Sequence, residues 1–436
     1  MRPVNSPRSA PAVAMVTTCL ALAGCAHAAP VARHPPTTGA PTTSPTPSMS
    51  TPTATTTTMQ QVASDACDEA AIGDAASPAP FRPAPTTTGP GPSWDEHTLI
   101  AGTCPQVVDP AVGAGFALVS HVPTDQGPWV LQRIDIDRAT TETGATFSVG
   151  SLTVAAGYLW ISCGRSIAGD STGPLLCQVD PSSLAVVRQI QLPRPSPPPQ
   201  SSAPQRSVSN SYQLSVAQGP GATVWVGYDR TLVHIATGDG ELLTSVPIAS
   251  GTVASVSVDP ALHSLYVALS YPTVAGQTVD AAVVEFDART GQLLAATPET
   301  SEVTDSVAGG ALTAVPGGVW MSFRTGMLGE TLLLRQSDLA VVGPSVASLA
   351  GQPDGVFRWI MDASTIYGDG ALFVVNENGV MACADPRLGV VRAQQHLAAA
   401  QGNSFELLAV DPTSGQVLAT DGNGLQSITP PSSCRV

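Results

Sequence analysis

Apolar residues along most of the chain are spaced as in short β-strands. From about residue 97 onward they alternate with polar residues or run in short groups, and Gly, Pro, Asp and Asn separate the groups. Strands bounded by turn residues have this pattern, whereas an amphipathic helix repeats its apolar residues at helical spacing over a longer segment. The pattern therefore predicts an all-β fold over residues 96–436, with no convincing helix.

One motif recurs in this region: a turn, then a small residue, any residue, and an apolar–large–apolar–small run. Gly157-Tyr158-Leu159-Trp160-Ile161-Ser162 is an example. The steps between successive large residues are 42, 65, 41, 54, 53 and 45 positions, and the longest step contains a Pro- and Ser-rich insert, Arg194–Asn210. A period of about 40–45 residues with four strands per unit is typical of a propeller blade, so the repeat predicts a seven-bladed β-propeller. The large residues are Leu118, Trp160, Trp225, Tyr266, Trp320, Phe373 and Leu418.

The repeat also predicts how the blades pack and how the ring closes. A large residue in each second strand should fill the wedge between adjacent sheets. The last copy ends early, because Pro430 and Pro431 follow the predicted strand Leu425–Thr429. Its fourth strand must then come from elsewhere, and Thr98–Ala101 is the natural donor. Such pairing joins the chain ends and removes an exposed sheet edge.

The repeat resembles a large superfamily of bacterial propellers. The segment Asp287-Ala288-Arg289-Thr290-Gly291-Gln292-Leu293-Leu294 is similar to the Asp-x-x-Thr-Gly turn of the YVTN-type, PQQ-repeat-like and streptogramin-lyase-like proteins. Ile235-Ala236-Thr237-Gly238 and Asp180-Pro181-Ser182-Ser183 are weaker relatives of that turn. The resemblance covers residues 97–436 and implies a fold rather than an activity.

The N-terminal segment has the order of an export signal. Arg2 and Arg8 precede an apolar stretch that ends in Leu22-Ala23-Gly24-Cys25. This end resembles the bacterial lipobox, in which the Cys is acylated (palmitate being a usual acyl chain) and becomes the mature N-terminus. Residues 1–24 are then a lipoprotein signal peptide, and two acyl chains on Cys25 give stable membrane anchoring. The alternative is an ordinary signal peptide cleaved near Ala26-His27-Ala28.

Residues 25–95 are predicted to be a disordered Pro/Thr-rich linker. In Pro35–Thr58, 17 of 24 residues are Pro or Thr, so the segment has little apolar surface to bury. We expect it to hold the propeller away from the membrane, as a lipid-anchored protein on the extracytoplasmic side of the cell membrane. Glycosylation of this segment stays open.

Composition excludes one class of partner. The 436 residues include 18 Arg and no Lys, and the formal net charge is −15. Beyond residue 59, 15 Arg and 33 acidic residues give a net charge of −18. A nucleic-acid-binding domain needs a basic face to neutralise phosphates, so no nucleic acid is expected as a partner. Membrane contact is expected through the N-terminal lipid alone.

The cysteines predict disulfides rather than a metal site. Six Cys remain after Cys19 and Cys25, and an even number in an exported chain is typical of disulfides. Cys163 ends a predicted second strand and Cys177 lies in the following strand, so this pair can meet across the hairpin. Proximity in sequence favours Cys67–Cys104 and Cys383–Cys434 among the remaining pairings. No two Cys have zinc-ligand spacing, and no cofactor or metal is expected.

No motif indicates a catalytic site. The chain has no Gly-x-Ser-x-Gly elbow and no phosphate-binding loop, and its His residues fall at different strand positions in different blades. No residue pattern of the streptogramin lyases can be matched here. Asp135-Ile136-Asp137 and Asp421-Gly422-Asn423-Gly424 suggest cation ligands, but turn chemistry explains both segments.

Loop length indicates where binding takes place. The long connections join strands two and three or one blade to the next, and in a propeller these emerge on one face, which often binds partners. Unconstrained drift of loop length is the alternative. We therefore expect a monomeric, non-catalytic envelope module that binds a protein, peptide or glycan, the alternative being a channel-mouth lyase or hydrolase. Candidate residues at the long-loop face are Tyr212, Arg324, Arg358 and Asp362.

Overall fold

The structure is a computed structural model of the chain, and its described residues lie in one compact unit, Pro52–Val436. Two 3-10 turns, Pro110–Val112 and Ser432–Cys434, are the helical segments in this described part, and neither is long and apolar enough to cross a membrane. Only the backbone is described for 56–58, 120, 308–310, 322–325 and 328–332. The described residues are 56–58, 94–101, 105–120, 128–147, 151–164, 173–195, 214–249, 251–270, 283–297, 308–325, 328–340, 364–375, 380–388, 390–397, 406–420 and 424–435.

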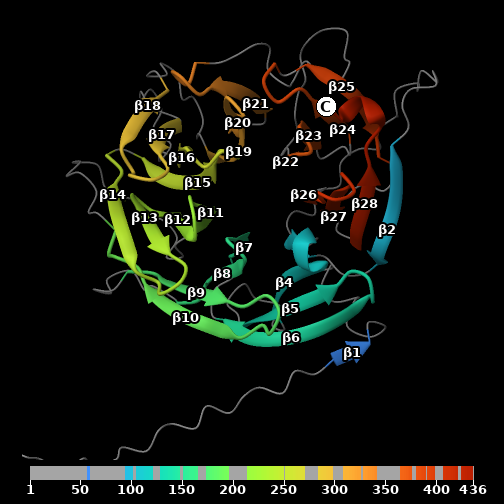
Figure 1. Cartoon of the computed structure of the whole chain (residues 1–436), viewed down its shortest axis with the longest axis horizontal. Helices are drawn as coiled ribbons and strands as arrows, with labels where there is room; N and C mark the ends of the chain where they lie inside the picture. The colour runs from blue at the N-terminus through green and yellow to red at the C-terminus, as the bar shows by residue number, and fades with distance from the viewer. Residues whose placement is uncertain are drawn as a thin grey trace, which may run out of the picture. The chain divides into compact units, whose positions relative to one another are not determined.

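Seven antiparallel sheets form this unit, as the seven copies of the motif predict. Their innermost strands contact one another in sequence order, and the innermost strand of the last sheet contacts that of the first, which closes the ring seen in Figure 1. The fold is therefore a seven-bladed β-propeller. The innermost strands of blades 1 to 7 are β3 (Val107–Asp109), β7 (Leu152–Ala155), β11 (Ser215–Gln218), β15 (Thr252–Val258), β19 (Ala308–Val315), β22 (Ser364–Gly368) and β26 (Glu406–Val410).

The second strands carry the repeated motif. They are almost continuously buried, as in β16, because adjacent blades cover both faces of each sheet. This double burial explains why the sequence shows short apolar runs here rather than strict alternation. The second strands are β4 (Ala114–Ser120), β8 (Tyr158–Ser162), β12 (Thr223–Tyr228), β16 (Ser264–Ser270), β20 (Gly318–Thr325), β23 (Ala371–Val375) and β27 (Val417–Thr420).

The third strands are also largely buried, and the fourth strands form the rim of the propeller. The third strands are β5 (Trp129–Asp135), β9 (Leu175–Val179), β13 (Thr231–Ala236), β17 (Val283–Asp287), β21 (Leu328–Arg335), β24 (Val380–Ala384) and β28 (Gly424–Thr429). The fourth strands are β6 (Thr140–Phe147), β10 (Val186–Gln191), β14 (Leu242–Pro247), β18 (Leu293–Ala296), β25 (Val391–His396) and, in blade 7, β2 (Asp95–Ala101). In blade 5 the described residues form three strands.

Blade 7 closes with a strand from the N-terminal side, which confirms the predicted donor. β2 pairs antiparallel with β28, from Asp95 opposite Thr429 to Ala101 opposite Gly424. The preceding Trp94 is buried as well. Its backbone N–H donates a hydrogen bond to Gln395 Oε1 in blade 6 (3.1 Å), and its ring lies edge-on to Phe373, with centroids 6.4 Å apart. The folded unit thus includes Trp94 and Asp95 in addition to the predicted range.

A short strand is added to blade 1. The backbone of β1 (Thr56–Thr58) pairs antiparallel with the outer edge of β6, so that this sheet has five strands. These three residues belong to the range for which the sequence predicts a linker.

The large residues of the motif lie between blades, as predicted. Trp225 Nε1–H of blade 3 donates to the carbonyl of Ala288 in blade 4 (2.7 Å), and Trp320 Nε1–H of blade 5 donates to the carbonyl of Pro386 in blade 6 (3.0 Å). These indoles therefore join neighbouring blades by hydrogen bonds as well as by packing. The other large residues pack in apolar clusters shared with the next blade: Leu118, Trp160, Tyr266, Phe373 and Leu418.

Candidate functional site

A recess lies where two innermost strands end. It has a volume of about 450 Å³ and is formed by the end of β11 in blade 3, and by β15 with its following turn in blade 4. Both strands belong to the inner ring of Figure 1, so the recess adjoins the propeller axis on the side of the first-to-second-strand turns. Its lining residues are Val216, Ala217, Gln218, Val256, Ser257, Val258, Asp259, Pro260 and Leu262.

Among the residues that line this recess, Asp259 is ionisable, and it is only 6% exposed. Its Oδ1 accepts hydrogen bonds from the backbone N–H groups of His263 (2.6 Å) and Ser264 (2.8 Å). Ion pairs among the described residues do not include Asp259. The recess therefore contains a buried carboxylate whose charge no described basic side chain offsets.

A buried polar cluster is connected to Asp259 through Ser264. Ser264 Oγ–H donates to Glu285 Oε1 (2.7 Å), and Gln336 Nε2–H donates to Ser264 Oγ (2.8 Å). Gln336 comes from blade 5, so the cluster joins two blades. Tyr266 is directly opposite Glu285 on the neighbouring strand, and its buried hydroxyl has no hydrogen-bond partner among the described residues.

Burial dominates the acid–base behaviour of this cluster. Burial raises the pKa of Glu285. The hydrogen bond from Ser264 partly opposes this rise, and the nearby Asp259 carboxylate adds to it. Burial likewise raises the pKa of Tyr266, and the adjacent Glu285 adds to that shift. Both effects have one cause, because a low-dielectric environment disfavours the charged form of an acid.

Asp259 and Glu285 by themselves do not make up a set of metal ligands. Two carboxylates fall short of the six to eight oxygens, roughly, that Ca²⁺ takes. No group of three or more His, Cys, Asp or Glu that could hold a metal ion occurs in the described part of the chain. A buried carboxylate in a recess lined by both polar and apolar residues can bind a cationic group or a hydrogen-bond donor.

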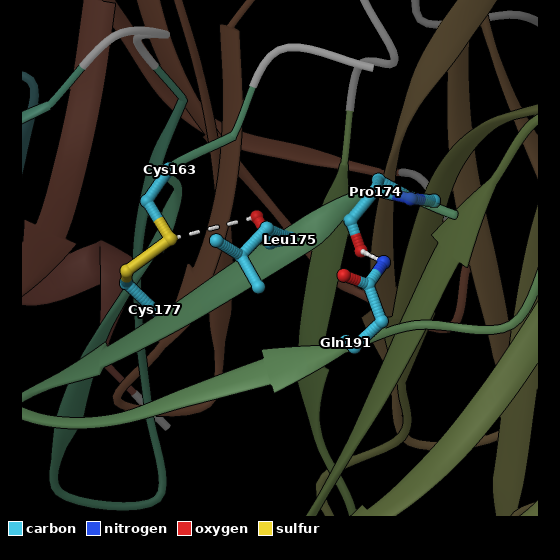
Figure 2. Close-up of a disulfide and its surroundings, with 5 residues drawn as sticks. All are labelled: Cys163, Pro174, Leu175, Cys177 and Gln191. Carbon is cyan, nitrogen blue, oxygen red and sulfur yellow. Dashed lines mark hydrogen bonds between the residues drawn. A yellow bond between two sulfur atoms is a disulfide. The ribbon is translucent and has the colours of Figure 1, made fainter. Parts of the chain in front are cut away.

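One disulfide constrains blade 2 and another constrains the C-terminal tail. Cys163 and Cys177 are joined (S–S 2.09 Å) across the hairpin of blade 2, as the sequence predicts (Figure 2). Gln191 Nε2–H donates to the carbonyls of Gly173 (2.6 Å) and Pro174 (3.3 Å), which holds the end of the same connection against the outer strand. The described residues on both sides of this connection are therefore anchored to the sheet.

The second disulfide, Cys383–Cys434, attaches the C-terminal tail to blade 6 (S–S 1.98 Å). This pairing is the one that proximity in sequence favours. Arg392 of blade 6 also donates to the carbonyl of Cys434 (3.3 Å). The predicted partners Cys67 and Cys104 lie outside the described residues.

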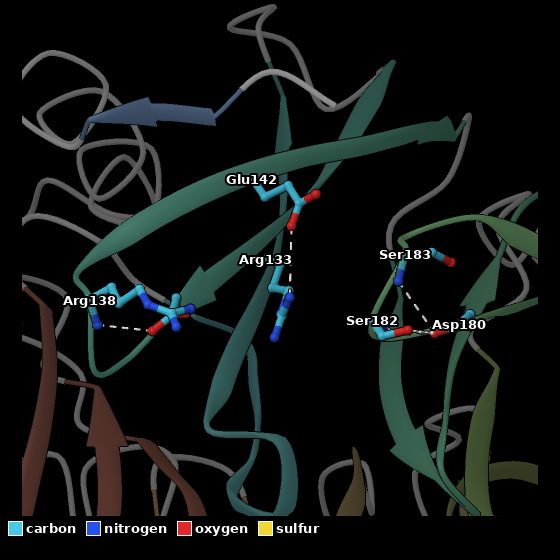
Figure 3. Close-up of polar contacts among 7 residues, drawn as sticks. Arg133, Arg138, Glu142, Asp180, Ser182 and Ser183 are labelled. Atoms are coloured by element: carbon cyan, nitrogen blue, oxygen red, sulfur yellow. Dashed lines mark hydrogen bonds and ion pairs between the residues drawn. The ribbon is translucent and has the colours of Figure 1, made fainter. Parts of the chain in front are cut away.

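The acidic turn at Asp135 has a structural role, as the sequence predicts, whereas residues 421–423 of the other acidic segment lie outside the described residues. Asp135 Oδ1 accepts from the Arg138 N–H (2.9 Å), and Asp180 Oδ1 accepts from the N–H (2.7 Å) and hydroxyl (2.6 Å) of Ser182. Figure 3 shows these turns with the Arg133–Glu142 ion pair of blade 1 (3.7 Å). The hydrogen bonds lower the pKa of Asp180, because they favour its ionised form.

The predicted binding-face residues are not brought into a described site. Tyr212, Arg358 and Asp362 lie outside the described residues, as do most of the long connections. Arg324 belongs to β20, where its backbone pairs with Ala308 and Gly329. Cys25 also lies outside the described residues.

Sequence reasoning missed Asp259 and Glu285. Glu285 is a single acidic residue within the apolar run Val283-Val284-Glu285-Phe286, and an ionisable residue inside a predicted buried strand is a usable signal. Asp259 carries no such signal, because Asp followed by Pro is an ordinary turn sequence.

Comparison with known proteins shows no family for this chain. No protein-family model and no curated protein matches the chain. Among solved structures, BamB from Moraxella catarrhalis is similar, with a TM-score of 0.43 and 12% identity over 74% of this chain and 82% of that chain. That identity is too low to carry a function from BamB to this chain.

Proposed function

We propose that this protein is a cell-envelope lipoprotein, anchored through acylated Cys25, whose propeller is a non-catalytic binding or scaffold module for a protein, peptide or glycan. The observation that carries the proposal is the recess between β11 and β15. Strands of two blades build it beside the axis, a usual position for ligand sites in ring-shaped folds. The lining combines apolar side chains with the buried carboxylate of Asp259.

Two further observations support an extracytoplasmic binding module. Disulfides persist in oxidising compartments, and the bridges Cys163–Cys177 and Cys383–Cys434 both form. The closed ring also holds the recess on inner strands rather than on loops, so its geometry is fixed before a ligand arrives.

The test uses the full-length protein in detergent micelles, applied to arrays of peptides and glycans. Gln218→Trp fills the recess from an exposed position at its rim, and Glu241→Trp is a matched control at an exposed turn of the same blade. We expect a bound ligand to be lost with Gln218→Trp and retained with Glu241→Trp. If binding of a ligand is lost only when Arg194–Asn210 is shortened, the binding site lies on the long-loop face instead. No binding to either array would refute the proposal.

A further inference from the structure

We propose that the recess between β11 and β15 binds a primary ammonium group on a short apolar stem, with Asp259 Oδ2 as its charged partner. The inference rests on the proposed binding function and names the class of ligand. Asp259 is a carboxylate in the wall of an open recess, is 6% exposed and has no ion-pair partner in the described part of the chain.

The hydrogen bonds of Asp259 leave one oxygen for a ligand. Oδ1 already accepts from the N–H groups of His263 and Ser264, whereas Oδ2 has no hydrogen-bond partner among the described residues. A guanidinium group prefers to bind both oxygens of a carboxylate through two parallel bonds. An ammonium group is a point charge that needs one oxygen, so it fits the remaining half of this carboxylate better.

The acidic Glu285 close to Asp259 also favours binding of a cation in the recess. Glu285 interacts electrostatically with Asp259 and is 3% exposed, so two acidic groups lie close together in a region of low dielectric. The buried hydroxyl of Tyr266 lies in the same cluster, and no described residue satisfies it. A cation seated on Asp259 would offset this concentration of negative charge and oxygen atoms.

The rest of the wall selects the stem of the ligand. Apolar side chains come from Ala217 and Val258 of the two strands and from the turn, and Gln218 lies at the exposed rim. A short alkyl chain would cover these side chains, while the ammonium group reaches the carboxylate. The apolar residues available to such a stem are Ala217, Val258, Pro260 and Leu262, because Val216 and Val256 are buried in the clusters between blades.

The ammonium group must belong to a molecule other than this protein, either a free amine or a polypeptide that contains Lys. None of the 436 residues is Lys, so a Lys side chain of a second copy cannot supply it. The net charge of −18 beyond residue 59 attracts cations toward the propeller in general. A free alkylamine and a Lys side chain of a partner polypeptide share this chemistry, and the experiment distinguishes them.

Isothermal titration calorimetry of the full-length protein in detergent micelles tests the ligand class. The probes are 1-pentylammonium, 1-pentylguanidinium and 1-pentanol, with N-acetyl-lysine N-methylamide representing a partner's side chain. We expect 1-pentylammonium to bind about tenfold more tightly than 1-pentanol, the size expected for one partly buried charge pair. Stronger binding of the lysine derivative than of 1-pentylammonium would point to a polypeptide partner, and the reverse to a free amine.

Two variants locate the site. Asp259→Asn keeps an oxygen that accepts from His263 and Ser264, so the turn should fold, and it should abolish the preference for 1-pentylammonium. Asp239→Asn, at an exposed turn of blade 3, should leave the preference unchanged. Gln218→Lys places an ammonium group at the rim of the recess and should weaken 1-pentylammonium binding about tenfold, whereas Gln218→Met should not.

Two outcomes would overturn the inference. Equal affinity for 1-pentanol and 1-pentylammonium would show that the recess binds apolar ligands without regard to charge, and would leave the proposed binding function intact. A preference that survives in correctly folded Asp259→Asn would place the ammonium site elsewhere. The array experiment with Gln218→Trp tests the binding function separately, so failure of one proposal does not imply failure of the other.

Discussion

A polar side chain lies opposite the large aromatic residue in three consecutive blades. Gln178, His234 and Glu285 are the cross-strand partners of Trp160, Trp225 and Tyr266. Gln178 Nε2–H donates to the carbonyl of Thr237 in the next blade (3.0 Å), and the His234 ring stacks on Trp225 with centroids 4.4 Å apart. Each buried polar group thus has a specific partner, as such groups need. Glu285 differs from the other two because it can carry a negative charge.

We expect Glu285→Gln to change how stability depends on pH. The pKa of Glu285 is raised in the folded state from its usual 4.5, so the folded protein binds this proton more tightly than the unfolded chain does. Stability must then fall as pH rises from about 4.5 through the folded pKa. Gln is neutral and keeps an oxygen for Ser264, so the variant should lack this fall and melt at a higher temperature near pH 8. Calorimetric Tm measurements from about pH 4 to about pH 8 test it.

We expect Asp287→Asn to change the pH dependence of stability in the opposite direction. Hydrogen bonds from Thr290 lower the pKa of Asp287, so this group stabilises the fold above its usual pKa of 3.8, and that stability is lost as pH falls. The wild type should melt above Asp287→Asn at neutral pH, and the difference in Tm should shrink toward acid pH.

The Glu285 prediction has a clear contrary result. Parallel Tm profiles of wild type and Glu285→Gln over this pH range would show that burial does not raise the pKa of Glu285.

At the scale of elements, the sequence predicts the second strands best. Their motif recurs because every second strand meets the same environment, a blade on each side. Burial marks the outer strands less clearly, because β14 and β18 expose apolar side chains, including Leu243 (45%) and Leu293 (57%). The β1 strand has no apolar pattern at all, since it consists of Thr56–Thr58, and only backbone pairing with β6 defines it.

The two disulfides should contribute different amounts of stability. The chain-entropy model gives about 3 kcal/mol for a loop the size of Cys163–Cys177 and about 4 kcal/mol for the longer Cys383–Cys434 loop. The sequence separations are 14 and 51 residues. Urea unfolding of the two double Cys→Ser variants should show the larger loss for Cys383 and Cys434. An equal or reversed order would mean that the native-state contacts of the bridges outweigh loop entropy.

At the scale of the whole molecule, stability depends on closure of the ring. Deleting residues 94–101 removes β2 and Trp94, which exposes the edge of β28 and opens the contact with Phe373. We expect the whole propeller to lose stability cooperatively, with a markedly lower Tm by circular dichroism. Deletion of an equal length within the Pro/Thr-rich segment, residues 35–42, is the control and should leave the Tm unchanged. An unchanged Tm without β2 would contradict this role of closure.

Membrane attachment should depend on Cys25 alone. Two acyl chains give stable anchoring, and the acidic propeller would be repelled by anionic lipid. Cys25→Ala should therefore abolish palmitate labelling and move the protein out of the membrane fraction, as measured by fractionation. Cys19→Ala is the matched control and should change neither. A Cys25→Ala protein that stays in the membrane fraction would contradict the lipoprotein interpretation.

The sequence by itself determined the all-β class, the seven blades, the closing strand and the pairing of Cys163 with Cys177. These follow from local patterns, because each blade repeats the same burial and the same turns. Only the tertiary structure decided the extension of β2 to Asp95, the addition of β1, and the recess with Asp259 and Glu285. Asp259 and Gln336 are 77 positions apart, and both contact Ser264 only because blades 4 and 5 pack side by side. Contacts between blades depend on how the ring closes, and that information is spread over the whole chain rather than held in any one repeat.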